Sequence, residues 1–286
     1  MTGRSLAVAA CFAFLNILDP FSAASDPAHV WDEAVLILDE IRSETSIDMG
    51  FAGLEAYQRT DIIFEEITEG DLKRFVSFLS VFQEETGKYP PGFFAKGELT
   101  KVVFVKKLFY ESQPAQGVYR FPEAVMYFDI YRDFGNEPAQ RHGIHHEVFH
   151  MIDISLRRRF NLGEAQVLVE LKEGSERLGM MKDPYGWEAL NESGFKYERV
   201  GRWHKGRNEL NFFAPPKAGF ATDYGFVSME EDMAEVYACL FIESENRLLH
   251  QWAQKDRILA AKIQKMKTML QLFSPLIDKH FWEDPI

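Results

Sequence analysis

The central stretch of this chain is RHGIHHEVFHMID, residues Arg141–Asp153. It contains the pattern H-E-x-x-H, formed by His146, Glu147 and His150. On a helix with about 3.6 residues per turn, two histidines four positions apart project from one face and can bind the same metal ion. A glutamate directly after the first histidine lies beside that ion, where it can take a proton from a water molecule. The pattern therefore predicts a zinc site and hydrolytic chemistry.

A solvated helix could carry the same residues without a chemical role, so the surrounding sequence has to support the interpretation. The residues before the motif provide the structural context that a zinc peptidase needs. Two β-rich runs, Lys101–Tyr110 and Ala124–Tyr131, precede the motif. Asn136 can cap the motif helix, with Pro138 in its first turn. Strands followed by an H-E-x-x-H helix are typical of the upper half of a zincin. We expect the strand at Ala124–Ile130 to form the sheet edge that holds an extended peptide.

Composition limits the classes of protein that are compatible with this chain. It has 286 residues, of which 46% are hydrophobic and 27% are charged, so it is long enough for a substantial core. The formal net charge is −12, and the densest basic cluster is the short run Arg157–Arg159. Nucleic-acid binding needs an extended basic face, so a nucleic-acid partner is not expected.

The N-terminus has the features of an export signal. A short basic segment precedes the apolar run Leu6–Leu15, and the small residues Ser22–Ala24 follow. The apolar run is too short to span a bilayer. We expect a signal peptide at 1–24 and a mature chain at 25–286 without a transmembrane segment. The mature protein is then secreted or otherwise extracytoplasmic, which means periplasmic in a Gram-negative host.

The chain contains two cysteines. Cys11 lies in the signal, where the surrounding residues loosely resemble a lipoprotein cleavage site and leave lipid anchoring open. Cys239 is the only cysteine of the expected mature chain, which excludes an intrachain disulfide.

The remaining periodic segments predict one α+β catalytic domain, because no repeat or low-complexity linker divides them. We expect an upper lobe at about 60–160, with a small mixed sheet and the motif helix, above a mainly helical lower lobe at about 161–286. Outside the motif helix, the apolar periodicity predicts helices at Ala28–Ser43, Glu69–Thr86, Ser228–Phe241 and Asp256–Ile277, and a strand at Asp61–Ile67.

The third metal ligand distinguishes between classes of zincin. A metzincin would have glycine in place of Asp153 and histidine in place of Leu156, so this class is excluded. A deformylase-like site would need an upstream cysteine, and the only one lies in the predicted signal. The acidic start of the helix expected at Ser228–Phe241 offers Glu231 and Glu235, which share a face. One can bind the metal while the other orients a ligand from behind.

These fragments together resemble a known family. The motif H-E-x-x-H-x-x-D at His146–Asp153 is followed by Tyr224-Gly225 and, seven residues after the tyrosine, by E-x-x-A-E at Glu231–Glu235. This combination resembles the catalytic domain of anthrax lethal factor and the secreted gluzincins similar to it, which have the same motifs at the same spacing. The likeness covers roughly Ala124–Phe241. It implies a zincin-like fold and a zinc metallopeptidase, most simply an endopeptidase acting on a peptide or protein substrate.

The resemblance also implies roles for individual residues. His146, His150 and Glu231 would be the ligands of one Zn²⁺ ion. Glu147 would be the general base, and Tyr224 would donate its hydroxyl hydrogen to the oxyanion. Asp153 and Glu235 would support the ligands from behind.

The ligand register has one close competitor, because Glu230 directly precedes Glu231. Adjacent helical residues are turned about 100° apart, so the two carboxylates cannot both point at one ion. The seven-residue step from Tyr224 selects Glu231.

Two questions remain open from the sequence. The same ligands could serve a catalytically inactive, exported zinc protein that acts as a binding or scaffold module. Structural zinc sites usually have four protein ligands, and the three identified here favour the enzyme. The segment Glu164–Asp223, which includes the basic and aromatic run Arg202–Arg207, could be a substrate-facing loop or an ordinary surface loop.

Overall fold

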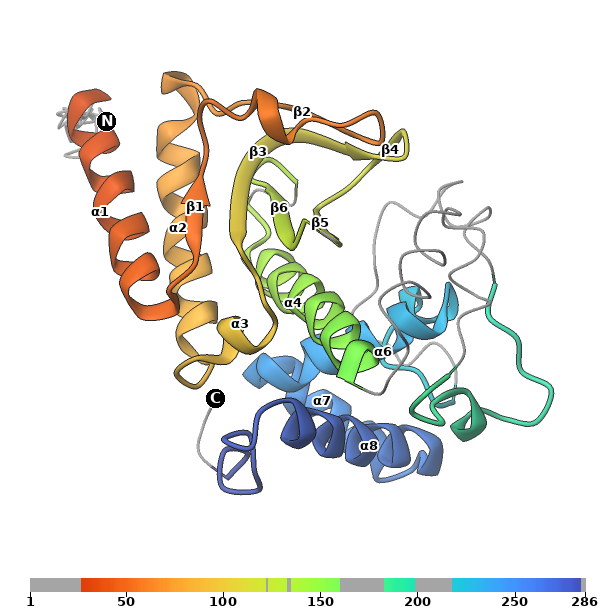
Figure 1. Ribbon diagram of the computed structural model, residues 1–286. Helices are drawn as coiled ribbons and strands as arrows, with labels where there is room; N and C mark the ends of the chain where they lie inside the picture. The colour runs from red at the N-terminus through yellow and green to blue at the C-terminus, as the bar shows by residue number, and fades with distance from the viewer. Residues whose placement is uncertain (1–26, 122, 133–134, 160–182, 199–217, 284–286) are drawn as a thin grey trace, which may run out of the picture.

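The computed structural model describes residues 27–121, 123–132, 135–159, 183–198 and 218–283. These residues form an α+β structure with one mixed sheet and helices packed around it (Figure 1). The predicted signal peptide, Cys11 and the run Arg202–Arg207 lie outside the described residues.

The main sheet has the strand order β1-β3-β6-β5. Strand β3 is parallel to β1 and to β6, whereas β5 is antiparallel to β6. The far half of β3 leaves this sheet and forms antiparallel pairs with β2 and β4. The strands are β1 (Asp48–Gly50), β2 (Ile62–Glu65), β3 (Lys101–Tyr110), β4 (Gln113–Pro114), β5 (Gly117–Arg120) and β6 (Val125–Asp129).

The edge strand is not the one expected from the sequence. Strand β6, which corresponds to the predicted edge at Ala124–Ile130, lies between β3 and β5 and is paired on both sides. The edge is β5, whose register places Val118 opposite Tyr127. The prediction was wrong because β5 has only four residues, too few for a clear alternating pattern.

Both faces of the main sheet are buried, because alternate residues of β3 and β6 enter two different cores. One face packs with helices α2 (Leu72–Gly87) and α4 (Glu137–Arg159), and the other is covered by the segment that includes β2. The residues on the helical side are Val102, Phe104, Met126 and Phe128, and those on the opposite side are Val103, Val105, Val125 and Tyr127.

Helix α4 is central in the fold. It lies between the sheet on one side and helices α6, α7 and α8 on the other (Figure 1). Helices α1 and α2 lie side by side, and α2 packs on the same face of the sheet as α4 (Figure 1). The α-helices are α1 (Pro27–Thr45), α2 (Leu72–Gly87), α3 (Phe93–Lys96), α4 (Glu137–Arg159), α6 (Met229–Phe241), α7 (Glu243–Ala253) and α8 (Arg257–Phe273). Short 3₁₀ helices are η1 (Glu55–Tyr57), η2 (Glu69–Asp71), η4 (Glu188–Leu190) and η5 (Tyr224–Phe226).

The predicted helices and strands are present, with ends that differ by a few residues. Strand β1 pairs with β3, and α1 packs on α2, so the sheet side of the molecule begins with α1. None of the described helices is long and apolar enough to cross a membrane.

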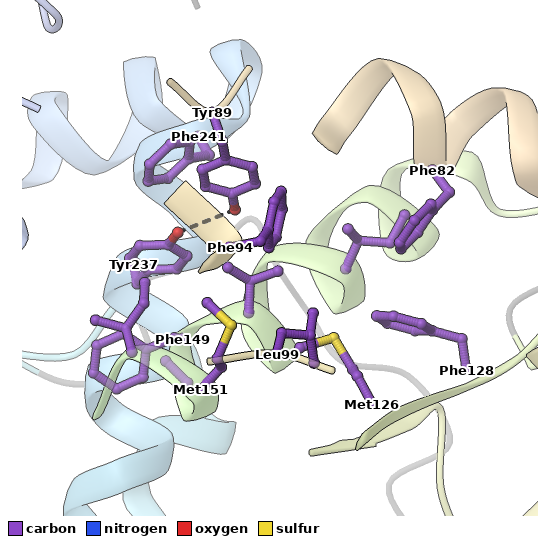
Figure 2. Close-up of a cluster of buried hydrophobic side chains, with 14 of the residues drawn as sticks. Phe82, Tyr89, Phe94, Leu99, Met126, Phe128, Phe149, Met151, Tyr237 and Phe241 are labelled. Atoms are coloured by element: carbon purple, nitrogen blue, oxygen red, sulfur yellow. Dashed lines mark hydrogen bonds between the residues drawn. The ribbon is translucent and has the colours of Figure 1, made fainter. Parts of the chain in front are cut away.

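A continuous apolar core joins α4 to its neighbours on both sides (Figure 2). Phe149 of α4 is fully buried against Tyr237 of α6, with ring centroids 5.4 Å apart. The Tyr237 hydroxyl donates a hydrogen bond of 3.0 Å to the Tyr89 hydroxyl, beyond the end of α2. Helix α4 is therefore held firmly between the sheet and α6, which fixes the position of the histidines it carries.

Candidate metal centre

The two motif histidines project from α4 toward the same point. The start of this helix is fixed by Asn136, whose side-chain oxygen accepts a hydrogen bond of 3.4 Å from the backbone N–H of Ala139. The His146 and His150 rings have centroids 4.9 Å apart, and their Nε2 atoms are separated by 3.2 Å. The spacing of four residues thus produces the convergence that the sequence predicts.

Helix α6 brings Glu231 to the same point. Ser228 caps this helix and accepts a hydrogen bond of 3.2 Å from the Glu231 backbone N–H, which orients the first turn. The Glu231 Oε2 atom lies 2.9 Å from His146 Nε2 and 3.7 Å from His150 Nε2. His146, His150 and Glu231 therefore form a group whose donor atoms can hold one metal ion.

Two observations fit a metal ion at this point. Donor atoms about 2.0–2.1 Å from an ion at tetrahedral angles lie about 3.3 Å from one another, close to the separations observed here. Glu231 Oε2 is also buried without a hydrogen-bond partner among the described residues, although two ring nitrogens are near. The side chains of His146, His150 and Glu231 remain 11%, 23% and 18% exposed, so a water molecule or substrate can reach the group.

The charges around this group attract a cation. Burial lowers the pKa of His146, but Glu231 and Glu235 outweigh this effect and raise it well above its ordinary value. Burial would raise the pKa of Glu231, yet the adjacent histidines lower it to about 2. The carboxylate is thus ionised at neutral pH, and positive charge is favoured beside it.

Glu147 lies beside the group and beneath the edge strand. Its Oε2 atom accepts a hydrogen bond of 3.1 Å from the backbone N–H of Tyr119 in β5. Gly117 of the same strand packs so closely that an added Cβ would lie 2.5 Å from Glu147 Cγ. Burial raises the pKa of Glu147, against the opposing charges of His150 and His146. A carboxylate with a raised pKa is a better proton acceptor near neutral pH.

Tyr224 lies at the start of η5, next to His146. The two ring centroids are 5.7 Å apart. The negative charge of Glu231 and burial raise the pKa of Tyr224 well above its ordinary value. The hydroxyl therefore keeps its proton and can act as a hydrogen-bond donor.

Glu235 supports His146 from behind. Its Oε1 atom accepts a hydrogen bond of 2.8 Å from His146 Nδ1, and its other oxygen accepts one from the Thr222 hydroxyl. Because an ionised carboxylate only accepts hydrogen bonds, Nδ1 of His146 carries the proton. Nε2 faces Glu231 and His150, and it would supply its lone pair to a metal ion that displaces the proton from this nitrogen.

Asp153 lies in a buried cluster with Arg157 and Tyr185. Its carboxylate accepts hydrogen bonds of 2.8 and 2.9 Å from Arg157 Nε and one of 2.9 Å from the Tyr185 hydroxyl. The other end of the Arg157 side chain donates to Glu230 Oε1 at 3.2 Å. Glu230 is thus directed toward Arg157 and not toward the histidines. Through this arginine, Asp153 of α4 is linked to the start of α6, the helix that carries Glu231.

The sequence reasoning missed residues that continue the site into the interior. His142 Nε2 lies 3.2 Å from Glu235 Oε1, and His142 Nδ1 lies 2.7 Å from Glu245 Oε2. His142 is four residues before His146, so helical spacing alone places both on one face. Glu245 belongs to the separate helix α7, and nothing in its local sequence points to the site.

Comparison of the chain with models of protein families, with curated proteins and with solved structures finds no match.

Proposed function

We propose that this protein is a zinc metallopeptidase of the gluzincin type, with a zincin-like catalytic domain and a peptide or protein substrate. The observation that carries the proposal is the open group of His146, His150 and Glu231, with Glu147 directly beside it. Three protein ligands with partial exposure are typical of catalytic zinc sites, because structural sites are usually closed by a fourth ligand. The resemblance to the lethal factor family, based on the same residues, supports this reading.

The side chains around the group are suited to hydrolysis of an amide. Zinc supplies Lewis acidity there, which acidifies water and polarises a carbonyl group. Glu147 is placed to accept a proton from the attacking water and to pass it to the leaving nitrogen. Tyr224 is placed to donate a hydrogen bond to the carbonyl oxygen as negative charge develops on it.

Strand β5 is suited to hold the substrate backbone. The Tyr119 N–H points away from β6 and donates to Glu147, so the edge of β5 that pairs with no other described strand faces the general base. An extended peptide can add to such an edge through main-chain hydrogen bonds. Next to it is a hollow of about 250 Å³, between Tyr119 at one side and Ile154 and Ser155 of α4 at the other. Ile154 lies one helical turn beyond His150, so this hollow can receive a substrate side chain close to the scissile bond.

The decisive experiment combines metal content with proteolysis. We expect the purified mature chain to contain about one zinc per molecule and to cleave a peptide library until a chelator is added. Glu147→Gln should retain the zinc and lose cleavage, since only the proton acceptor is removed. Full proteolysis by Glu147→Gln with zinc bound would contradict the mechanism. Zinc binding without any cleavage by the parent protein would favour the alternative of an inactive binding or scaffold module.

The predicted signal places this activity outside the cytoplasm. N-terminal sequencing of the protein from its native host tests this, with a mature terminus near Ser25 expected. A soluble cytosolic protein that retains Met1 would rule out export.

A further inference from the structure

A chain of buried polar residues leads from His146 to α7. Glu235 Oε1 lies 2.8 Å from His146 Nδ1 and 3.2 Å from His142 Nε2. The other ring nitrogen of His142, Nδ1, lies 2.7 Å from Glu245 Oε2. The side chains of His142, Glu235 and Glu245 are only 5%, 3% and 5% exposed, so water contributes little to their interactions. Two buried carboxylates thus enclose one imidazole ring.

This arrangement determines how many protons His142 carries. Ionised carboxylates accept hydrogen bonds and cannot donate them, so each ring nitrogen of His142 must donate to the carboxylate it faces. A ring that donates from both nitrogens is an imidazolium cation. Burial alone lowers the pKa of His142, but Glu235 and Glu245 together raise it to about 10. His142 is therefore a fixed positive charge between two negative ones.

A second metal site is the competing interpretation of the same cluster, since His142, Cys239 and Glu245 have donor atoms close enough to hold an ion. The contacts do not favour it. The 2.7 Å separation of His142 Nδ1 and Glu245 Oε2 is that of an ordinary hydrogen bond. Burial raises the pKa of Cys239 well above its ordinary value, with a further contribution from Glu245, so the thiol keeps its proton. Only a thiolate binds metal well. The polar groups of this cluster thus have hydrogen-bond partners without an ion, whereas the Oε2 atom of Glu231 has none among the described residues.

We propose that His142 is a positioning residue for the metal centre: it holds Glu235 in place, and through Glu235 it fixes the ring of His146. The inference rests on the proposed function only in that His146 is taken as a metal ligand.

His142 can affect the metal centre because it holds the carboxylate of Glu235 in place. The carboxylate of Glu235 receives hydrogen bonds from His142, His146 and Thr222. Of the two histidines, only His142 lies on the side of Glu235 that faces away from the proposed metal ion. Without His142, the Oε1 atom of Glu235 would lose one of the two ring nitrogens that hold it, and the carboxylate could rotate or shift away from His146. Either change removes the acceptor that keeps the proton on Nδ1 of His146. Losing the partner that orients a ligating histidine typically weakens metal binding about 10–100-fold.

The experiment compares the zinc affinity of three variants with that of the parent protein, by competition with a chromophoric chelator. His142→Gln should weaken zinc binding about 10–100-fold. Glu245→Gln should weaken it less, because the amide oxygen can still accept the hydrogen bond from His142 Nδ1. The matched control is His145→Gln. His145 is equally buried on α4, but its ring nitrogens face Glu85 and Tyr89, each at 2.5 Å, so its loss should lower stability without changing zinc affinity.

The outcomes separate this inference from the proposed function. If the parent protein binds no zinc, the proposed function fails. If the parent binds one zinc and His142→Gln binds it as tightly, the positioning role of His142 is wrong. If the parent binds two zinc ions and Cys239→Ser binds one, the cluster is a second metal site and the inference is also wrong.

A measurement on the parent protein covers the case in which His142→Gln does not fold. In the zinc-loaded chain, nitrogen-15 NMR should show protons on both ring nitrogens of His142 at neutral pH. A ring without a proton on Nε2 would overturn the inference, because it could not donate a hydrogen bond to Glu235.

Discussion

The backbone N–H of Tyr119 donates a hydrogen bond of 3.1 Å to the carboxylate of Glu147. This contact joins the edge strand β5 to helix α4 at the residue proposed as general base. The surface that would bind the substrate backbone and the group that would move its proton are thus in direct contact. A small change in the separation of strand and helix should therefore affect catalysis more than metal binding.

Gly117→Ala tests this dependence. The added Cβ would lie 2.5 Å from Glu147 Cγ and 3.1 Å from the Tyr127 carbonyl oxygen, so Glu147 must shift. We expect kcat/KM to fall on the order of 100-fold, as is typical of a misplacement of about 1 Å, while zinc content is retained. Gly70→Ala is the matched control, because an added Cβ there meets nothing within 4 Å. Equal activity of the two variants would contradict the placement of the base.

Tyr224→Phe tests the proposed hydrogen bond to the developing oxyanion. Removing one such donor typically lowers kcat about 10²–10³-fold. Zinc affinity should be unchanged, because the hydroxyl is not one of the ligands. Tyr131→Phe is a suitable control, since the Tyr131 hydroxyl donates to Asp71, far from the metal centre. Kinetics on a cleavable peptide, with zinc content measured in parallel, gives the comparison. A fall in zinc content that accounts for the lost activity would exclude the proposed role.

Glu231→Gln should impair zinc binding, whereas Glu230→Gln should impair stability. Glu231→Gln removes the anionic ligand and should largely abolish tight zinc binding. Glu230→Gln should retain zinc but weaken the buried contact with Arg157, at a cost of about 1–3 kcal/mol of stability. Zinc titration and urea unfolding of both variants separate the two effects. Loss of zinc from Glu230→Gln with retention by Glu231→Gln would require a different register, and Tyr224 would have to be reassigned.

The environment of Glu85 predicts how the free energy of unfolding depends on pH in acid. Burial would raise the pKa of Glu85, but His145 and Lys88 outweigh it and lower the pKa to about 2. Because the folded pKa is below the unfolded value, the ionised carboxylate stabilises the fold above about pH 4.5, and this contribution is lost as pH falls toward 2. Glu85→Gln should cost on the order of 2 kcal/mol at pH 7 and progressively less below pH 4.5. Urea unfolding between pH 2.5 and 7 measures this, and a difference independent of pH would contradict it.

Local sequence patterns are enough to predict the elements that carry the candidate site. Helical spacing within one segment places His146 and His150 together on α4, and the acidic start of α6 is visible from Ser228 onward. The α+β class follows from the same local patterns, because hydrophobic periodicity depends only on residues close in the chain.

The tertiary structure decided which of these residues meet. Strand β5 became the edge because β6 pairs on both sides, a fact that depends on strands far apart in the sequence. Asp153 pairs with Arg157, and His142 is enclosed by Glu235 and Glu245, which lie 93 and 103 residues away. A buried carboxylate binds the nearest donor in space, and local sequence does not encode that donor. The candidate metal ligands could thus be identified from local sequence, whereas the residues that contact them from other helices could be identified only from the fold.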